Sequence, residues 1–220
     1  MKKLLVMIFL FVSSHLFSQT CGYFPAQEGA VFEMQTFNEK GKLQLINTSV
    51  VKVINGDKIT IDAKVVDEKN KPVTSMTYDA ICKDGNLTID GGAFVPAGMF
   101  EGKNNATVSI TGDKIVYSQA LNSGQTLPDA SIGIKMEMQG MPFPFNSDVK
   151  ITNRKVVGEE EITVPAGTFK CWKITYDIQY KMLISFRGTA VEWIAPGKGF
   201  IKSESYTKNN KLAGYSVRTK

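Results

Sequence analysis

Apolar and polar side chains alternate along most of this chain, with an apolar residue at every second position. The alternation is clearest in residues 59–65, 132–138 and 172–180. Successive residues of a β-strand point to opposite faces of a sheet, so each of these segments has one apolar and one polar face. The pattern predicts antiparallel strands that pack one face on a core and expose the other.

Turn-forming residues separate the alternating segments at short and regular intervals. Glycine and asparagine supply the positive φ angles that tight reversals need. Short connections are expected at Asn55-Gly56, Asp84-Gly85 and Gly112-Asp113, and longer ones at residues 39–42, 68–71 and 208–211. A type II turn is expected at residues 195–198, where Pro196 and Gly197 occupy the two central positions.

These signals predict an all-β fold with little helix, because no stretch keeps a helical period for more than two turns. We expect one antiparallel sheet of about eleven strands, and a twisted sheet of that size has to curl or close. The predicted architecture is therefore an open or half barrel. Residues 91–105 and 118–130 interrupt the alternation and are expected to form long connections.

The N-terminus has the composition of a secretory signal peptide. Lys2 and Lys3 precede an apolar run at residues 4–12, which is shorter than the roughly 20 residues a membrane-spanning helix needs. We predict cleavage near Ser18, so that residues 1–18 are the signal peptide and residues 19–220 form a single β domain. The mature protein is then periplasmic or secreted.

Lipid attachment at Cys21 is the alternative processing. The three residues before this cysteine are Ser18, Gln19 and Thr20. They lack the apolar residue and the small residues that precede a lipid-modified cysteine, so we do not expect a lipoprotein.

The chain is moderately basic, with a formal net charge of +5 and a pI of about 9.0. Its basic residues are distributed one or two per hairpin and form no stripe in the sequence. A nucleic-acid partner is therefore not expected.

The three cysteines allow three possible disulfide pairs, and export places the chain where thiols can pair. Cys171 lies between strand-forming residues and is expected to be a buried, free thiol. Cys21 and Cys82 both lie beside turn-like sequence, so we expect the disulfide between them.

The single histidine, His15, lies in the predicted signal peptide, so the mature chain has no imidazole. This excludes Ser-His-Asp and Cys-His mechanisms and zinc sites that use histidine. We therefore expect no enzymatic activity, no cofactor and no bound metal. Asp84, Asp90 and Asp113 lie near turns, but their spacing matches no calcium loop.

A carboxylate-based glycoside hydrolase is the remaining enzymatic alternative. Its candidate acids are Glu159–Glu161, and Asp177 together with Glu192. Consecutive acids on a strand point to alternate sides, which disfavours a shared site at residues 159–161.

Methionine and phenylalanine are unusually frequent in the predicted connections. Two interpretations stay open: these residues plug the ends of the barrel, or they line an apolar cavity for a lipid-like ligand. The candidate ligand-binding residues are Phe94, Met99, Phe100, Met136, Met138, Met141, Phe143, Phe145 and Met182.

Several segments resemble the TapB-like family of exported bacterial proteins, a family of unknown function. They are residues 21–25, 82–85, 165–171 (Pro-Ala-Gly-Thr-Phe-Lys-Cys) and 193–199 (Trp-Ile-Ala-Pro-Gly-Lys-Gly). The resemblance covers nearly all of the mature chain and implies no catalytic residues. More remotely, the fold resembles the half-barrels of the lipoprotein carriers LolA and LolB, whose concave face shelters acyl chains.

The leading hypothesis is an exported, non-enzymatic protein that binds an apolar or lipid-like small molecule on the concave face of a curled sheet. The alternative is an envelope or secretion accessory protein that acts through contacts with a protein partner. No membrane-spanning segment is expected in either case.

Overall fold

The computed structural model describes residues 22–25, 27–91, 106–138, 145–181 and 185–220. Thirteen strands join into one sheet, which confirms the predicted all-β class. They are β1 (Val31–Asn38), β2 (Leu43–Asn55), β3 (Lys58–Asp67), β4 (Pro72–Lys83), β5 (Asn86–Ile89), β6 (Ala106–Gly112), β7 (Ile115–Tyr117), β8 (Ala130–Met138), β9 (Phe145–Val164), β10 (Gly167–Lys181), β11 (Phe186–Ala195), β12 (Gly199–Thr207) and β13 (Leu212–Arg218). The sequence predicts fewer because β5 and β7, at 4 and 3 residues, are too short to show alternation.

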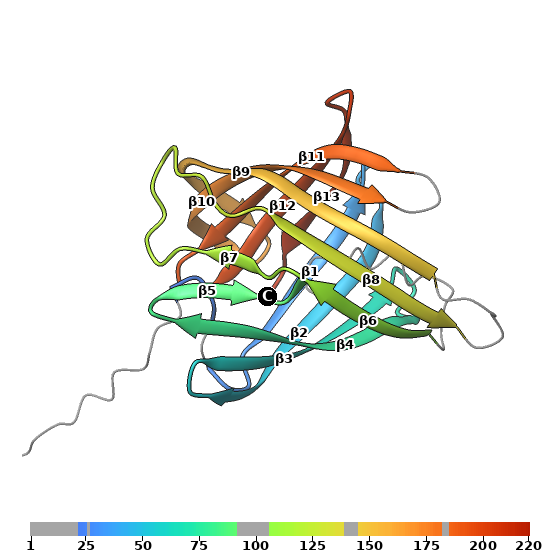
Figure 1. Ribbon diagram of the computed structural model, residues 1–220, viewed down its shortest axis with the longest axis horizontal. Coiled ribbons are helices and arrows are strands. Elements are labelled where there is room, and N and C mark those ends of the chain that lie inside the picture. The colour runs from blue at the N-terminus through green and yellow to red at the C-terminus, as the bar shows by residue number, and fades with distance from the viewer. Residues whose placement is uncertain (1–21, 26, 92–105, 139–144, 182–184) are drawn as a thin grey trace, which may run out of the picture.

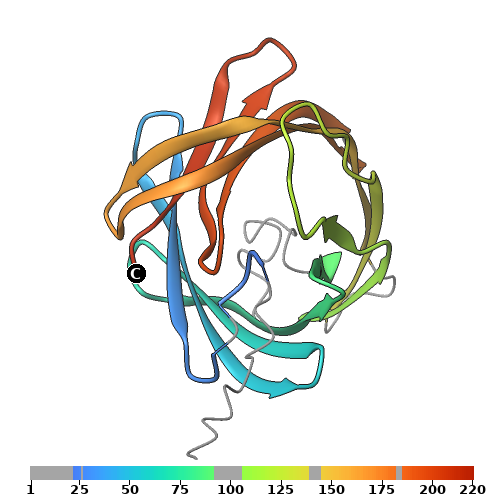
Figure 2. The same cartoon turned by 90° about the vertical axis from the view of Figure 1, so that its left-hand side faces the viewer.

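The sheet is curled and open, as predicted. Its strand order is β6-β8-β9-β10-β11-β12-β13-β1-β2-β3-β4-β5-β7, and each described pairing is antiparallel. The two edge strands, β6 and β7, are joined by Asp113 and Lys114 alone. A connection this short brings the two edges of the sheet together, so the strands follow a ring-shaped outline (Figures 1 and 2).

The predicted turns are confirmed, and three longer ones share one geometry. Gly41, Asn70 and Asn210 have φ angles of 74°, 60° and 59°. In the first turn the Asn38 carboxamide oxygen accepts hydrogen bonds from the backbone of Lys40 and Lys42, both at 3.0 Å. Each side-chain cap of this kind stabilises a tight reversal at the same end of the sheet.

One end of the curled sheet is filled by chain segments, and we call it the plugged end. Tyr23 and Phe24 of the N-terminal segment are buried there, together with Leu121 and Leu127 of the connection between β7 and β8. The Leu121 amide donates a hydrogen bond to the Tyr23 hydroxyl at 3.3 Å. The opposite end carries the three turns at residues 38–42, 67–71 and 207–211, and we call it the rim end.

Two hydrophobic cores lie on opposite faces of the sheet. The inner core fills the plugged half of the curl and includes Ile61, Ile132 and Ile174. The outer core is smaller and consists of Val164, Cys171, Trp193, Ala195 and Ile201. It forms where the long β9–β10 hairpin extends beyond the edge of β8 and packs on the outer face of β11 and β12.

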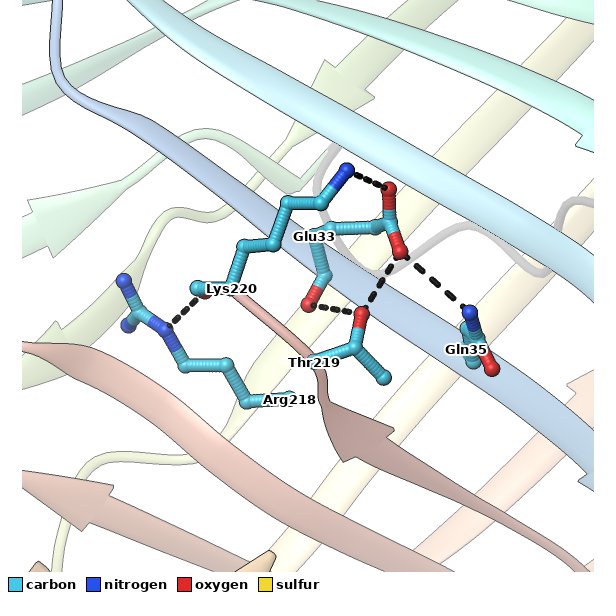
Figure 3. Close-up of polar contacts among 5 residues, drawn as sticks. All are labelled: Glu33, Gln35, Arg218, Thr219 and Lys220. Carbon is cyan, nitrogen blue, oxygen red and sulfur yellow. Dashed lines mark hydrogen bonds and ion pairs between the residues drawn. The ribbon is translucent and has the colours of Figure 1, made fainter. Parts of the chain in front are cut away.

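The C-terminus is fastened to β1 by a polar cluster (Figure 3). The Glu33 carboxylate accepts hydrogen bonds from the Thr219 hydroxyl at 2.6 Å and the Lys220 ammonium group at 3.1 Å. The Thr219 hydrogen bond is the main reason that the pKa of Glu33 is lowered. These contacts hold the C-terminal residues against β1.

Candidate functional site

A buried charged cluster crosses the interior of the curled sheet. Arg154 of β9 is 1% exposed and Glu192 of β11 is 2% exposed. The Tyr117 hydroxyl of β7 donates a hydrogen bond to Glu192 Oε1 at 2.9 Å, and Arg154 Nη2 lies 3.9 Å from the same oxygen. The guanidinium also stacks 4.9 Å from the centroid of the Tyr117 ring.

Arg154 connects β9, the third strand of the sheet, to edge strand β7 at its other end. Its Nη1 donates hydrogen bonds to the Val116 carbonyl on edge strand β7 at 2.9 Å and to the Pro128 carbonyl at 3.0 Å. Pro128 lies in the connection that leads into β8. The cluster therefore joins β7, β9 and the connection across the opening of the sheet, which assigns it a structural role.

Burial controls the ionisation of this cluster. Desolvation raises the pKa of Glu192, and the opposing effects of the Arg154 charge and the Tyr117 hydrogen bond are smaller. The pKa of Tyr117 is also raised, first by burial and then by the Glu192 charge. The Glu192 carboxyl group is therefore held, away from solvent, between an arginine and a tyrosine.

The inner face between this cluster and the rim end carries both buried side chains, such as Val65 and Ile178, and half-buried ones. Tyr78, Tyr176 and Tyr180 project from β4 and β10 and pack against the inner core, yet each keeps accessible surface. Burial still raises the pKa of Tyr78 and of Tyr180 to about 12, and it raises the pKa of Tyr176 as well. All three tyrosines are therefore partly accessible on the inner face, beside the inner core.

Small hydroxyl side chains line the same half of the inner face on the other wall. Ser203 and Ser216 are paired across β12 and β13, and the Thr36 hydroxyl of β1 lies 2.8 Å from the Ser216 hydroxyl. Ser205 of β12 continues this row toward the rim end. All four are half-buried. We call the tyrosines and these hydroxyls together the inner surface.

The structure leaves the predicted ligand-binding residues largely untested. Phe94, Met99, Phe100, Met141, Phe143 and Met182 lie outside the described residues. The backbones of Met136 and Met138 lie on β8 and that of Phe145 begins β9, where Met136 is paired with Phe145. These residues stay candidates.

Sequence reasoning missed the three tyrosines of the inner surface as ligand-binding candidates. Tyr176 and Tyr180 belong to the alternating segment at residues 172–180, which predicts their strand and their face. Alternation does not show that they keep accessible surface there. The feature of the sequence that could have identified them is the residue type: an inward-pointing tyrosine needs a polar partner or water for its hydroxyl.

The structure does not bring together Asp177 and Glu192, the carboxylate pair of the alternative glycoside hydrolase. Asp177 is exposed on the outer face, where it accepts a hydrogen bond from the Asn153 side chain at 2.7 Å, whereas Glu192 faces the interior. Asp177 pairs with Thr189 in the register and Ile174 with Glu192, so the two acids lie on opposite faces. Within the described ranges, no group of three or more His, Cys, Asp or Glu residues is placed to hold a metal ion.

Cys171 is a buried free thiol in the outer core, as expected. Burial, together with the Glu160 charge, raises its pKa to about 11. Trp193 is also a core residue here, covered by the ammonium groups of Lys173 and Lys202 at 5.3 and 4.8 Å from its ring. Cys82 is disulfide-bonded, and its pairing with Cys21 stays a prediction because Cys21 lies outside the described residues.

A shallow groove of about 1060 Å³ lies on the outer face of β2, β3 and β4. Its floor includes Val50, Asp62, Lys64 and Ser75. Asp62 is already engaged by the Thr77 hydroxyl at 2.7 Å and by Lys52 at 3.5 Å. The groove is the second candidate surface, after the inner one.

Comparisons with known proteins support the fold and the family. A Bacteroides fragilis protein, described as exported and as having a YmcC-like fold, is 24% identical, with a TM-score of 0.76 over 90% of this chain and 98% of that chain. A Parabacteroides distasonis protein described as a lipoprotein is 26% identical, with a TM-score of 0.78 over 91% and 98%. No curated protein matches.

These comparisons do not confirm the resemblance to the TapB-like family or to LolA and LolB, which stays a prediction. The described part of the chain contains no helix long and apolar enough to cross a membrane. The DUF3108-like family matches residues 27–217, nearly the whole described structure, so the chain belongs to the DUF3108-like family.

Proposed function

We propose that this chain is an exported, non-enzymatic binding protein that holds an apolar or lipid-like molecule on the inner surface of its curled sheet. The observation that carries the proposal is the contrast between the two halves of the interior. The plugged half is filled by Tyr23, Phe24 and the isoleucines of the inner core. Beside this core and toward the rim end, Tyr78, Tyr176 and Tyr180 keep accessible surface.

The chemistry of the inner surface favours a ligand with a long apolar part and a hydrogen-bonding group. Tyrosine rings and neighbouring aliphatic side chains supply apolar walls, and ligand sites of this kind use few polar groups for orientation. The hydroxyls of Ser203, Ser205 and Ser216 supply such groups. Arg154 Nη1 donates to two backbone carbonyls and Glu192 accepts from the Tyr117 hydroxyl, while Arg154 Nη2 lies 3.9 Å from Glu192 without a hydrogen bond. The two opposite charges are adjacent, so a strongly charged ligand is not favoured.

A matched pair of substitutions tests the site. Ser205→Phe places a large ring on the half-buried inner surface, and Ser75→Phe places the same ring on the exposed floor of the outer groove. The mature protein is titrated with a fluorescent fatty acid, and bound probe is followed by its emission. The proposal expects Ser205→Phe to weaken binding at least tenfold and Ser75→Phe to leave it unchanged.

The reverse result would move the site to the outer groove. Saturable binding that neither substitution affects, or no saturable binding by the unmodified protein, would contradict the proposal. Circular dichroism and urea unfolding of both variants identify a loss caused by misfolding.

We also propose export through the signal peptide at residues 1–18, which the descriptions of the two similar proteins as exported and as a lipoprotein support. We further propose that Cys21 pairs with Cys82. A cysteine in a disulfide cannot carry a thioether-linked lipid, so the two outcomes exclude each other. The intact mass of the protein from its native host, before and after reduction, tests this: a lipid adduct on Cys21 contradicts it.

A further inference from the structure

Four turns with basic residues lie next to one another at the rim end. They join β10 to β11, β12 to β13, β1 to β2 and β3 to β4, and these eight strands are consecutive in the sheet. In or beside the turns are Lys181, Arg187, Lys208, Lys211, Lys40, Lys42, Lys69 and Lys71, all exposed. We call this set the basic rim.

The spacing of the turns makes the basic rim act as one charged surface. Neighbouring strands lie about 4.8 Å apart, so consecutive turns, two strands apart, are separated by about 10 Å. That distance is close to the Debye length of about 10 Å at 0.1 M salt. The electrostatic fields of adjacent turns therefore reinforce one another along the row of strand ends at the rim end.

Charge is concentrated at this rim. Its eight basic residues stand against three acids in the same turns, Glu39, Asp67 and Glu68, an excess of five positive charges. The formal net charge of the whole chain is also +5, and two of those charges, Lys2 and Lys3, belong to the predicted signal peptide, so the mature chain outside the rim has a net charge of −2. The next turn, between β8 and β9, is flanked by Lys135, Glu137 and Asp148 and adds no positive charge.

The rim cations are also unpaired with the described carboxylates, as are the scattered exposed lysines Lys64, Lys83, Lys150, Lys155 and Lys198. None of the eight forms an ion pair with a described acid. Toward the plugged end, Lys58 pairs with Asp79 at 2.8 Å and Lys114 with Asp90 at 3.2 Å. Eight exposed cations without an ion pair, gathered at one end of the sheet, give the molecule a directed electrostatic field.

An exposed aromatic residue accompanies this charge. Phe186 begins β11 beside the first of the four turns and is 41% exposed, although its ring centroid lies 6.1 Å from that of Tyr180. Lysines around an exposed ring are the residues that settle at the boundary between water and lipid headgroups.

We propose that the basic rim docks this protein on an anionic phospholipid membrane surface. Flexible lysines are point charges that adapt to a fluid array of phosphates, whereas a folded acidic partner is better matched by planar, bidentate arginines. Seven of the eight rim cations are lysines. Membrane docking does not depend on ligand binding. If both proposals hold, docking through the basic rim places the rim end of the inner surface next to the lipid headgroups.

Vesicle binding by the mature, full-length protein tests the proposal. Phosphatidylcholine vesicles with and without phosphatidylglycerol are sedimented with the protein at low and high salt. Binding is expected only with the anionic lipid and is expected to fall as salt rises. A lysine near an anionic surface contributes about fivefold in affinity, so Lys208→Gln with Lys211→Gln should weaken binding by about 25-fold.

The matched control is Lys83→Gln with Lys198→Gln, two exposed lysines at the plugged end, which should leave vesicle binding unchanged. Equal weakening by both pairs, or equal binding to neutral vesicles, would overturn the proposal. Capture by immobilised polyglutamate without any vesicle binding would instead assign the rim to an acidic protein. Fatty-acid probe binding by the rim variant should be unchanged, which separates this test from that of the inner surface.

Discussion

Replacing Arg154 with methionine should destabilise the fold more than any exposed substitution. The change keeps most of the apolar length of the side chain but removes two hydrogen bonds, to the Val116 and Pro128 carbonyls, and the partner of Glu192. Breaking a buried ion pair by removing one partner costs about 3–5 kcal/mol. Protonation of Glu192, whose pKa burial already raises, offsets part of that cost. We expect a loss of about 4 kcal/mol, a large share of the 5–15 kcal/mol that is typical of a domain.

The assay is equilibrium urea unfolding followed by the fluorescence of Trp172 and Trp193, the only two tryptophans. Arg187→Met is the matched control, since Arg187 is exposed and should cost less than about 0.5 kcal/mol. Arg154→Met combined with Glu192→Met should lose less than Arg154→Met alone, because no unpaired charge stays buried. A loss below about 1 kcal/mol for Arg154→Met would refute the structural role of the cluster.

The same cluster gives stability a definite pH dependence. Because the folded pKa of Glu192 is raised above its ordinary value of 4.5, the native state holds this proton more tightly than the unfolded chain. The resulting stability is fully present below pH 4.5 and is lost as the pH rises through the raised pKa. Glu192→Gln cannot ionise, so the stability of the unmodified protein should fall relative to this variant over that interval. If the difference in unfolding free energy between the unmodified protein and Glu192→Gln does not change with pH, the raised pKa of Glu192 is contradicted.

Three further predictions follow from local geometry. A Cβ on Gly188 would lie 2.0 Å from the Tyr206 carbonyl, so Gly188→Ala should cost about 1–3 kcal/mol in urea unfolding, whereas Gly158→Ala, with only a 3.8 Å contact, should cost less. The Cys171 thiol, with its pKa raised to about 11 by burial, should resist iodoacetamide at pH 8 until urea unfolds the protein, and rapid native alkylation would contradict its burial. Thr219→Val removes the main cause of the lowered Glu33 pKa. Stability from Glu33 is present above pH 4.5 and lost as the pH falls through the folded pKa, so the variant should lose less stability on acidification than the unmodified protein.

Alternation predicts the sheet well but misplaces the buried charges. On β9, Val149 and Ile151 face inward, and a strict period of two would send Asn153 inward next. Asn153 instead has a φ angle of 56°, and the pairing of β9 with β10 shifts register there, so Arg154 turns inward. A bulge of this kind depends on the partner strand, which the local sequence does not contain.

The inward orientation of Glu192 could not be predicted for a different reason. This residue lies between Val191 and Trp193, so alternation assigns the two apolar neighbours to the core and the acid to solvent. The structure reverses this because the β9–β10 hairpin folds over the outer face and buries Trp193 in a second core. A strand covered on both faces loses the alternating signal on which the prediction rests.

The basic rim was also beyond local sequence reasoning. Its residues lie in the turns at residues 38–42, 67–71 and 207–211 and, as Lys181 and Arg187, at the facing ends of β10 and β11, and along the chain they look evenly distributed. The sheet order places β13 beside β1, which brings the last turns of the chain next to the first ones. Only this long-range pairing converts scattered lysines into a surface.

The central claim is that the inner surface holds an apolar molecule, and native mass spectrometry of the mature protein tests it most directly. The protein is purified from its native envelope without detergent and sprayed from a volatile buffer, and the same sample is then measured after denaturation. The account predicts a complex heavier than the chain that releases a lipid-like molecule on unfolding and is absent from Ser205→Phe. A bare chain mass in the native spectrum, together with no saturable uptake of added fatty acid, would contradict it.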